Sequence, residues 1–202
     1  MKRKSFISKN STKNQKKLYI ILIGLALLAL IIGIVFLFMI NNDSKLYIKD
    51  NLGNSITDST SNISLFFKTL FNNFLYIIII WLLGISIIGI PFVIFMYLFK
   101  YFLFGFSISS IIYTYGFKGI LVSIIELFPH KLLFLIILIL ITFYSLSFSI
   151  KLFKNLFLKR PINFRESMNK YVKILIISLT FTLFITLYEV FATNYLLNFF
   201  NI

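Results

Sequence analysis

Five long apolar runs occupy most of this chain, and all but the last contain no charged residue. A bilayer core is crossed by about 20 apolar residues in a helix that rises about 1.5 Å per residue. The runs approach or exceed that length, so the sequence predicts an all-α polytopic integral membrane protein with about five transmembrane helices. The predicted spans are 18–40, 74–99, 101–117, 132–150 and 174–200.

Composition supports lipid as the surrounding medium. Hydrophobic residues make up 59% of the 202 positions, too many for a soluble surface of this length to cover. The net charge is +14, but the basic residues flank the apolar runs and form no compact basic domain. Attraction to anionic lipid headgroups explains this placement, so we expect membrane lipids, and no nucleic acid, as partners. The chain has no cysteine, which excludes disulfides, thiolate zinc sites and iron–sulfur clusters.

Two basic blocks predict the orientation. One precedes the first run and the other lies between the fourth and fifth runs. The positive-inside rule assigns both to the cytoplasm, and four spans between them give the required even number. We therefore expect a cytoplasmic basic tail (residues 1–17) and a single transmembrane domain (residues 18–202), with an outer loop at 41–73, an inner basic loop at 151–173 and the C-terminus outside. The first run is followed by no signal-peptidase-like site and is interpreted as a retained anchor.

Three shorter segments carry their own predictions. The stretch Gly119–Phe128 is too short to span the bilayer and is expected to form a re-entrant or interfacial helix on the outer side. Residues 63–74 have one apolar helical face and form either an outer surface helix or an extension of the second span. Residues 152–157 predict a basic amphipathic surface helix that ends at Pro161, and a capping box at Asn163–Glu166 starts the last helix near Phe164.

Proline and lysine divide the long central apolar region. Pro91 lacks an N–H and is expected to kink the second span, with Gly89 leaving room for the bend. Lys100 interrupts the uncharged run and is expected to mark a tight turn on the inner side, where its amine reaches the headgroups.

Catalytic patterns are missing from the sequence. The single histidine, His130, lies at a predicted outer boundary without a neighbouring cysteine or carboxylate pair. There is no phosphate-binding glycine loop and no nucleophile elbow, and no two carboxylates have the helical spacing needed for paired acid–base work. We expect a protein that is not an enzyme and has no catalytic, metal or cofactor-binding residue.

Glu189 is the ionisable group placed most deeply in a predicted span. It shares one helical stripe with Ser178, Thr182, Thr186 and Thr193. Buried charge in a membrane is costly and commonly functional, so a proton or substrate path is one interpretation. The other is interhelical hydrogen bonding by a neutral carboxyl, which the lack of a basic partner in the other predicted spans favours.

The second span contains the motif W-L-L-G-x-S-x-I-G-x-P at 81–91, and a Phe-Lys pair, several glycines and Pro129 follow it. This pattern resembles the stage II sporulation protein M family. The resemblance covers nearly the whole chain, and Tyr101 departs from it where the family usually has Gly. The motif residues, which we expect to be structural, are Trp81, Gly84, Ser86, Gly89, Pro91, Lys100 and Gly105.

The resemblance implies a role in endospore engulfment. Members of this family are expected in the mother-cell or septal membrane, where they recruit the peptidoglycan-degrading stage II sporulation proteins D and P. Such a non-enzymatic scaffold would support septal thinning and membrane migration. The alternative is a permease subunit of a transporter, which the Glu189 stripe would suit. The sequence shows no internal repeat of the kind common in transporters.

Overall fold

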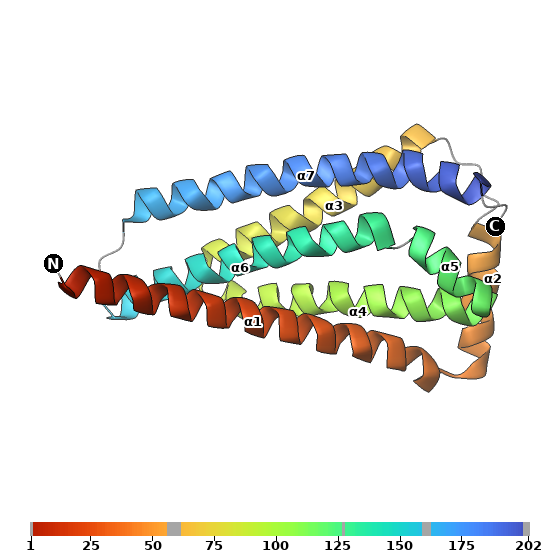
Figure 1. Ribbon diagram of the computed structural model, residues 1–202, viewed down its shortest axis with the longest axis horizontal. Coiled ribbons are helices and arrows are strands. Elements are labelled where there is room, and N and C mark those ends of the chain that lie inside the picture. Colours follow the sequence, from red (N-terminus) through yellow and green to blue (C-terminus); the bar gives the residue numbers. More distant parts are fainter. Residues whose placement is uncertain (1, 56–61, 127, 159–162, 200–202) are drawn as a thin grey trace.

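The structure is a computed structural model that describes residues 2–55, 62–126, 128–158 and 163–199. These residues form seven helices and no strand (Figure 1). The helices are α1 (Lys2–Met39), α2 (Asn42–Ser55), α3 (Asn62–Ile85), α4 (Gly89–Tyr115), α5 (Phe117–Glu126), α6 (Phe128–Leu158) and α7 (Phe164–Phe199). Among the described helices, α1, α3, α4, α6 and α7 are long and apolar enough to cross a membrane. The predicted all-α, five-span membrane architecture is confirmed.

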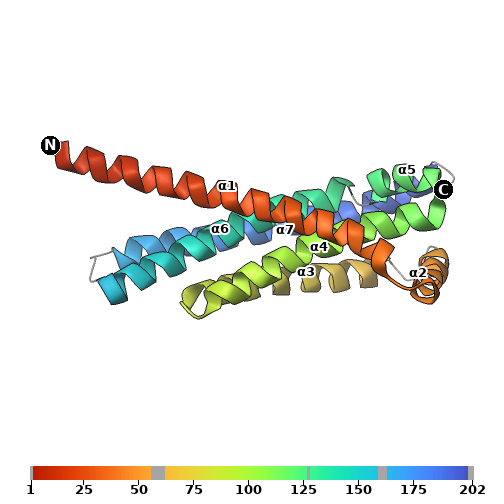
Figure 2. The same cartoon turned by 90° about the horizontal axis from the view of Figure 1, so that it is seen from below.

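The five long helices run in alternating directions along one axis (Figures 1 and 2). The start of α1, the end of α6 and the start of α7 lie at one end, which we call the basic end. The end of α1, helices α2 and α5 and the end of α7 lie at the other, which we call the cap end. The two basic sequence blocks are thus brought to the same end, as an even number of crossings between them requires.

Helix α5 is the short helix expected between the third and fourth spans. It has 10 residues and packs at the cap end against α4, α6 and α7. Gly116, which has a φ of 60°, reverses the chain after α4. A Cβ on Gly119 would lie 2.6 Å from the carbonyl oxygen of Ile111, so only glycine lets α5 fold this closely onto α4.

The boundary between the second and third spans differs from the prediction. Helix α3 ends at Ile85 and α4 begins at Gly89, so the chain turns at residues 86–88 and runs unbroken through Lys100. Pro91 lies in the first turn of α4 and does not kink a helix. The backbone N–H groups of a first turn have no acceptor within the helix, so the missing N–H of proline costs no hydrogen bond there. Gly89 completes the turn, since a Cβ there would overlap the carbonyl oxygen of Leu83. The predictions of a kink at Pro91 and an inner turn at Lys100 are wrong.

Other predicted boundaries change in the same direction, toward longer helices. The basic segment before Leu18 continues α1, and residues 152–157 are the last turns of α6 instead of a separate surface helix. Residues 63–74 belong to α3, which favours the extension over the surface helix. Helix α2 occupies much of the predicted outer loop. Helix α7 begins at Phe164 as predicted, where the Ser167 amide donates to the Asn163 carbonyl at 3.0 Å.

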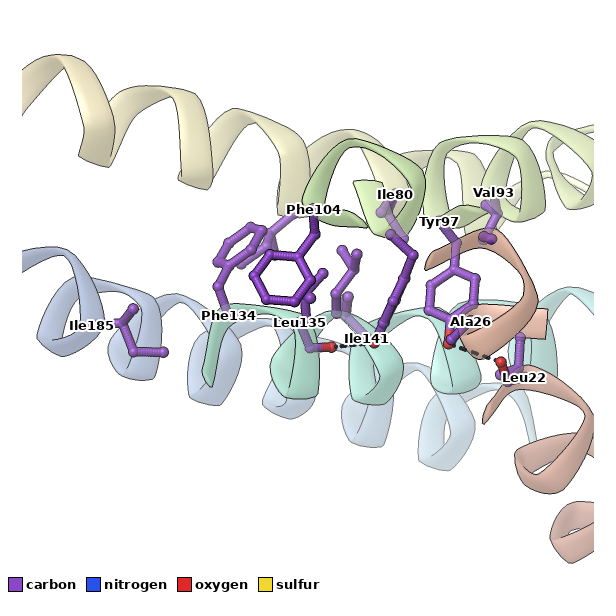
Figure 3. Close-up of a cluster of buried hydrophobic side chains, with 14 of the residues drawn as sticks. Leu22, Ala26, Ile80, Val93, Tyr97, Phe104, Phe134, Leu135, Ile141 and Ile185 are labelled. Carbon is purple, nitrogen blue, oxygen red and sulfur yellow. Dashed lines mark hydrogen bonds between the residues drawn. The ribbon is translucent and has the colours of Figure 1, made fainter. Parts of the chain in front are cut away.

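The core lies where α1, α3, α4 and α6 meet (Figure 3). Gly33 of α1 and Gly105 of α4 pack against each other's helix backbone, so that a Cβ on either would overlap a carbonyl oxygen of the other helix. Small residues permit this approach in lipid, where van der Waals packing drives association. Tyr97 donates to the Leu22 carbonyl at 3.1 Å, and Tyr101 donates to the Leu135 carbonyl at 2.9 Å. Tyr101, the departure from the family pattern, therefore ties α4 to α6.

Candidate functional site

The family-like motif at 81–91 forms the turn between α3 and α4. Gly84 is buried, and a Cβ there would lie 2.6 Å from the Ser145 Cβ and overlap the Tyr171 hydroxyl. The Trp81 ring stacks on Tyr171 at a centroid distance of 5.4 Å. The Gly89 amide donates to the Ser86 carbonyl at 3.2 Å and closes the turn. The motif thus specifies a tight reversal and a site on which α6 and α7 pack.

Three hydroxyls cover the carbonyl oxygens at the end of α3, and we call them the hydroxyl cap (Ser145, Ser149 and Tyr171). Tyr171 donates to the Trp81 carbonyl at 2.7 Å, and Ser149 donates to the Gly84 carbonyl at 2.5 Å. The hydroxyls of Ser145 and Tyr171 lie 2.8 Å apart. The last carbonyls of a helix have no partner within it, so hydroxyls from neighbouring helices replace the water that lipid lacks.

A polar pocket of about 360 Å³ opens nearer the cap end, between α3, α4, α6 and α7. It is lined by side chains from all four helices. They are Thr69, Asn72 and Asn73 of α3, Lys100, Leu103, Phe104 and Ser107 of α4, His130, Lys131, Phe134 and Leu135 of α6, and Glu189 of α7. This volume is within the range typical of small-ligand sites. The pocket combines several hydrogen-bond donors and one carboxylate with an apolar wall.

Lys100 lies about 16 Å along α4 from its first residue, at 1.5 Å per residue, and therefore deep within the span. Its Nζ is 4.7 Å from the centroid of the Tyr76 ring and 5.6 Å from that of Phe134. Cation–π contacts of this kind hold an ammonium without a counter-charge touching it. Lys100 is thus an intramembrane cation and not a headgroup contact.

Glu189 and His130 are in contact within the pocket. The His130 Nε2 lies 3.4 Å from the Glu189 Oε1, with side-chain exposures of 3% and 24%. Thr182 and Thr186 of the same stripe are fully buried, and each donates to the carbonyl four residues earlier in α7. Asn73 donates to the Thr186 hydroxyl at 3.5 Å and links the stripe to α3. The side chain of Thr193 lies outside the described residues.

Sequence reasoning found Glu189 but missed its basic neighbours. The sequence predicts His130 at the membrane boundary and Lys100 at a turn, which leaves the carboxylate without a basic partner. A break before Gly89 places Lys100 inside a span, and a glycine two residues before a proline is a signal for such a break. In the part of the chain that the structure describes, no three acidic or histidine side chains gather to hold a metal ion.

Comparison with known proteins identifies the family. No curated protein and no solved structure matches the chain. The family described as Stage II sporulation protein M matches residues 22–194. This range includes the α3–α4 turn and every residue that lines the pocket. It also includes the five predicted spans, apart from a few residues at the start of the first and the end of the last. The chain is a sporulation-related, multi-pass membrane protein and belongs to the Stage II sporulation protein M family.

Proposed function

We propose that this protein is a non-enzymatic scaffold for endospore engulfment. In this role it sits in the mother-cell or septal membrane and recruits the peptidoglycan-degrading stage II sporulation proteins D and P. Family membership supports the sporulation role. The permease-subunit alternative receives no such support from the family match.

The proposed orientation follows from charge. Described basic side chains at the basic end include Lys151 and Lys154 of α6 and Lys173 of α7. The positive-inside rule assigns that end to the cytoplasm. The cap end then faces the cell wall, where wall-degrading partners act.

The observation that carries the scaffold proposal is the fixed surface at the cap end. Helix α2 packs on α4, and α5 packs on α4, α6 and α7, so both short helices are held by the spans. The α5 helix displays apolar side chains outward: Phe117 is 88% exposed, Leu121 56% and Ile124 50%. Helix α5 is fixed in place by the spans, and its exposed apolar side chains can make the contacts that protein interfaces bury.

Site-specific crosslinking from sporulating cells tests this proposal. A photoreactive amino acid is placed at Phe117 on the cap end, and at Phe157 on the basic end as the matched exposed control. We expect the wall-degrading proteins to be recovered from position 117 and not from 157. Recovery of a transport ATPase from 157, with no wall-degrading protein from 117, would replace the scaffold with the permease.

A further inference from the structure

A scaffold role does not require the polar pocket, and the pocket is lined by oppositely charged side chains that do not contact each other. Lys100 and Glu189 line the same pocket, yet they form no ion pair within 4.0 Å of each other among the described contacts. Opposite charges in a medium of low dielectric attract strongly, and a pair usually closes to direct contact. Here the space of the pocket separates them.

Lys100 and Glu189 each have hydrogen-bonding atoms without a partner in the described structure. Within the described chain, Lys100 contacts two aromatic faces but no oxygen atom within hydrogen-bonding distance, so its three N–H donors are unpaired. Glu189 engages one carboxylate oxygen with His130 and leaves the other without a described partner. The His130 Nδ1 is also buried without a partner in the described structure. A buried polar atom such as the His130 Nδ1 normally has a hydrogen-bond partner, and a ligand is one way to supply it.

The remaining lining specifies the chemistry of an occupant. The pocket is also lined by a second lysine, Lys131, and by the Asn72 amide, and ammonium and amide N–H donors together suit the several oxygens of a phosphate. The ammonium groups of Lys100 and Lys131 attract a phosphate, and the Glu189 carboxylate attracts a primary amine, so an occupant that carries both groups matches the charges of the lining. Phe104 and Leu103 provide an apolar wall for a short carbon linker or lipid backbone.

We propose that the polar pocket binds a phosphoethanolamine group, with its phosphate held by Lys100 and its protonated amine held by Glu189. The group belongs either to a phospholipid headgroup or to a soluble compound, because both present the same chemistry. Within the pocket each of the two side chains contacts its own neighbours, Lys100 the aromatic rings of Tyr76 and Phe134 and Glu189 the imidazole of His130. The site is therefore preorganised for a zwitterion.

Native mass spectrometry of the full-length wild-type protein is the first test. The protein is purified in detergent with equal amounts of phosphatidylethanolamine, its N-acetylated form and phosphatidylglycerol. Charge-assisted hydrogen bonds predict roughly tenfold or greater retention of phosphatidylethanolamine over the other two lipids. A thermal-shift assay with free phosphoethanolamine and with glycerol phosphate tests for a soluble ligand. A larger rise in melting temperature with phosphoethanolamine would indicate one. Binding of either amine-bearing compound supports the site, and equal retention of all lipids with no shift overturns it.

Variants assign the roles within the pocket. Glu189→Gln should abolish the preference for the free amine while phosphate binding remains, and Lys100→Gln should lower retention of all phosphate lipids. Glu166→Gln and Lys68→Gln, two exposed positions outside the pocket, are the matched controls and should retain the preference. A preference unchanged in both pocket variants contradicts the assignment. If a pocket variant fails to fold, the wild-type comparison of the free and acetylated amines still decides the proposal.

Discussion

The α3–α4 turn and the polar pocket are both polar clusters inside the bundle, but only the turn is closed by hydrogen bonds. At the turn, three hydroxyls meet carbonyls at the end of α3, and glycine lets the helices touch. In the pocket, two lysines and a carboxylate from different helices line the same space. Because lipid supplies no water, the first arrangement serves stability, and the second is costly unless it serves binding.

The largest expected effect comes from filling the turn. Gly84→Val would push side-chain atoms into Ser145 and Tyr171, and we expect it to lower the free energy of unfolding by about 3 kcal/mol. Unfolding by sodium dodecyl sulfate, followed by helical circular dichroism, measures this loss. Gly24→Val is the control, because no atom lies within 4 Å of a Cβ at Gly24. Equal losses in the two variants would show that the turn is not closely packed.

Removal of one hydroxyl from the cap should have a moderate effect. Tyr171→Phe keeps the ring that stacks on Trp81 and Phe148 but removes the hydroxyl that contacts Trp81 and Ser145. We expect a loss of about 1 kcal/mol in the same unfolding assay. Tyr188→Phe, at an exposed position of the same helix, should change nothing. A neutral Tyr171→Phe would mean that the hydroxyl cap does not stabilise the turn.

A substitution in the pocket should change the free energy of unfolding least. Lys100→Met removes an intramembrane charge and keeps a flexible apolar side chain against Tyr76 and Phe134. Replacement of a poorly paired buried charge by an apolar residue is often neutral or stabilising, so we expect a change of less than about 0.5 kcal/mol in ligand-free detergent. A loss as large as that of Gly84→Val would make Lys100 a structural residue and erase the contrast between the two clusters.

The fold class and the number of spans could be predicted from the sequence because apolar length is a local property. The last helix was placed near Phe164 by its capping signal, and the short helix before His130 was identified by its length. The turn at 86–88 was missed because apolar residues surround it on both sides, so hydropathy marks no boundary there. Hydropathy instead predicts that boundary at Lys100, the charged residue within the apolar region. Its approach to Tyr76 and Phe134, and that of His130 to Glu189, arise from tertiary packing that no local pattern encodes.

The most direct measurement asks which residue near the α3–α4 turn reaches water at the end of the bundle that we propose to be cytoplasmic. The chain has no cysteine, so a single introduced cysteine reacts without background. Ile88, in the turn, is 78% exposed, and Phe99, next to Lys100 in α4, is 46% exposed on the surface of the span. With a membrane-impermeant maleimide added to inverted membrane vesicles, our account predicts labelling of Ile88→Cys and protection of Phe99→Cys by lipid. Labelling of Phe99→Cys with protection of Ile88→Cys would contradict it and return Lys100 to the membrane surface.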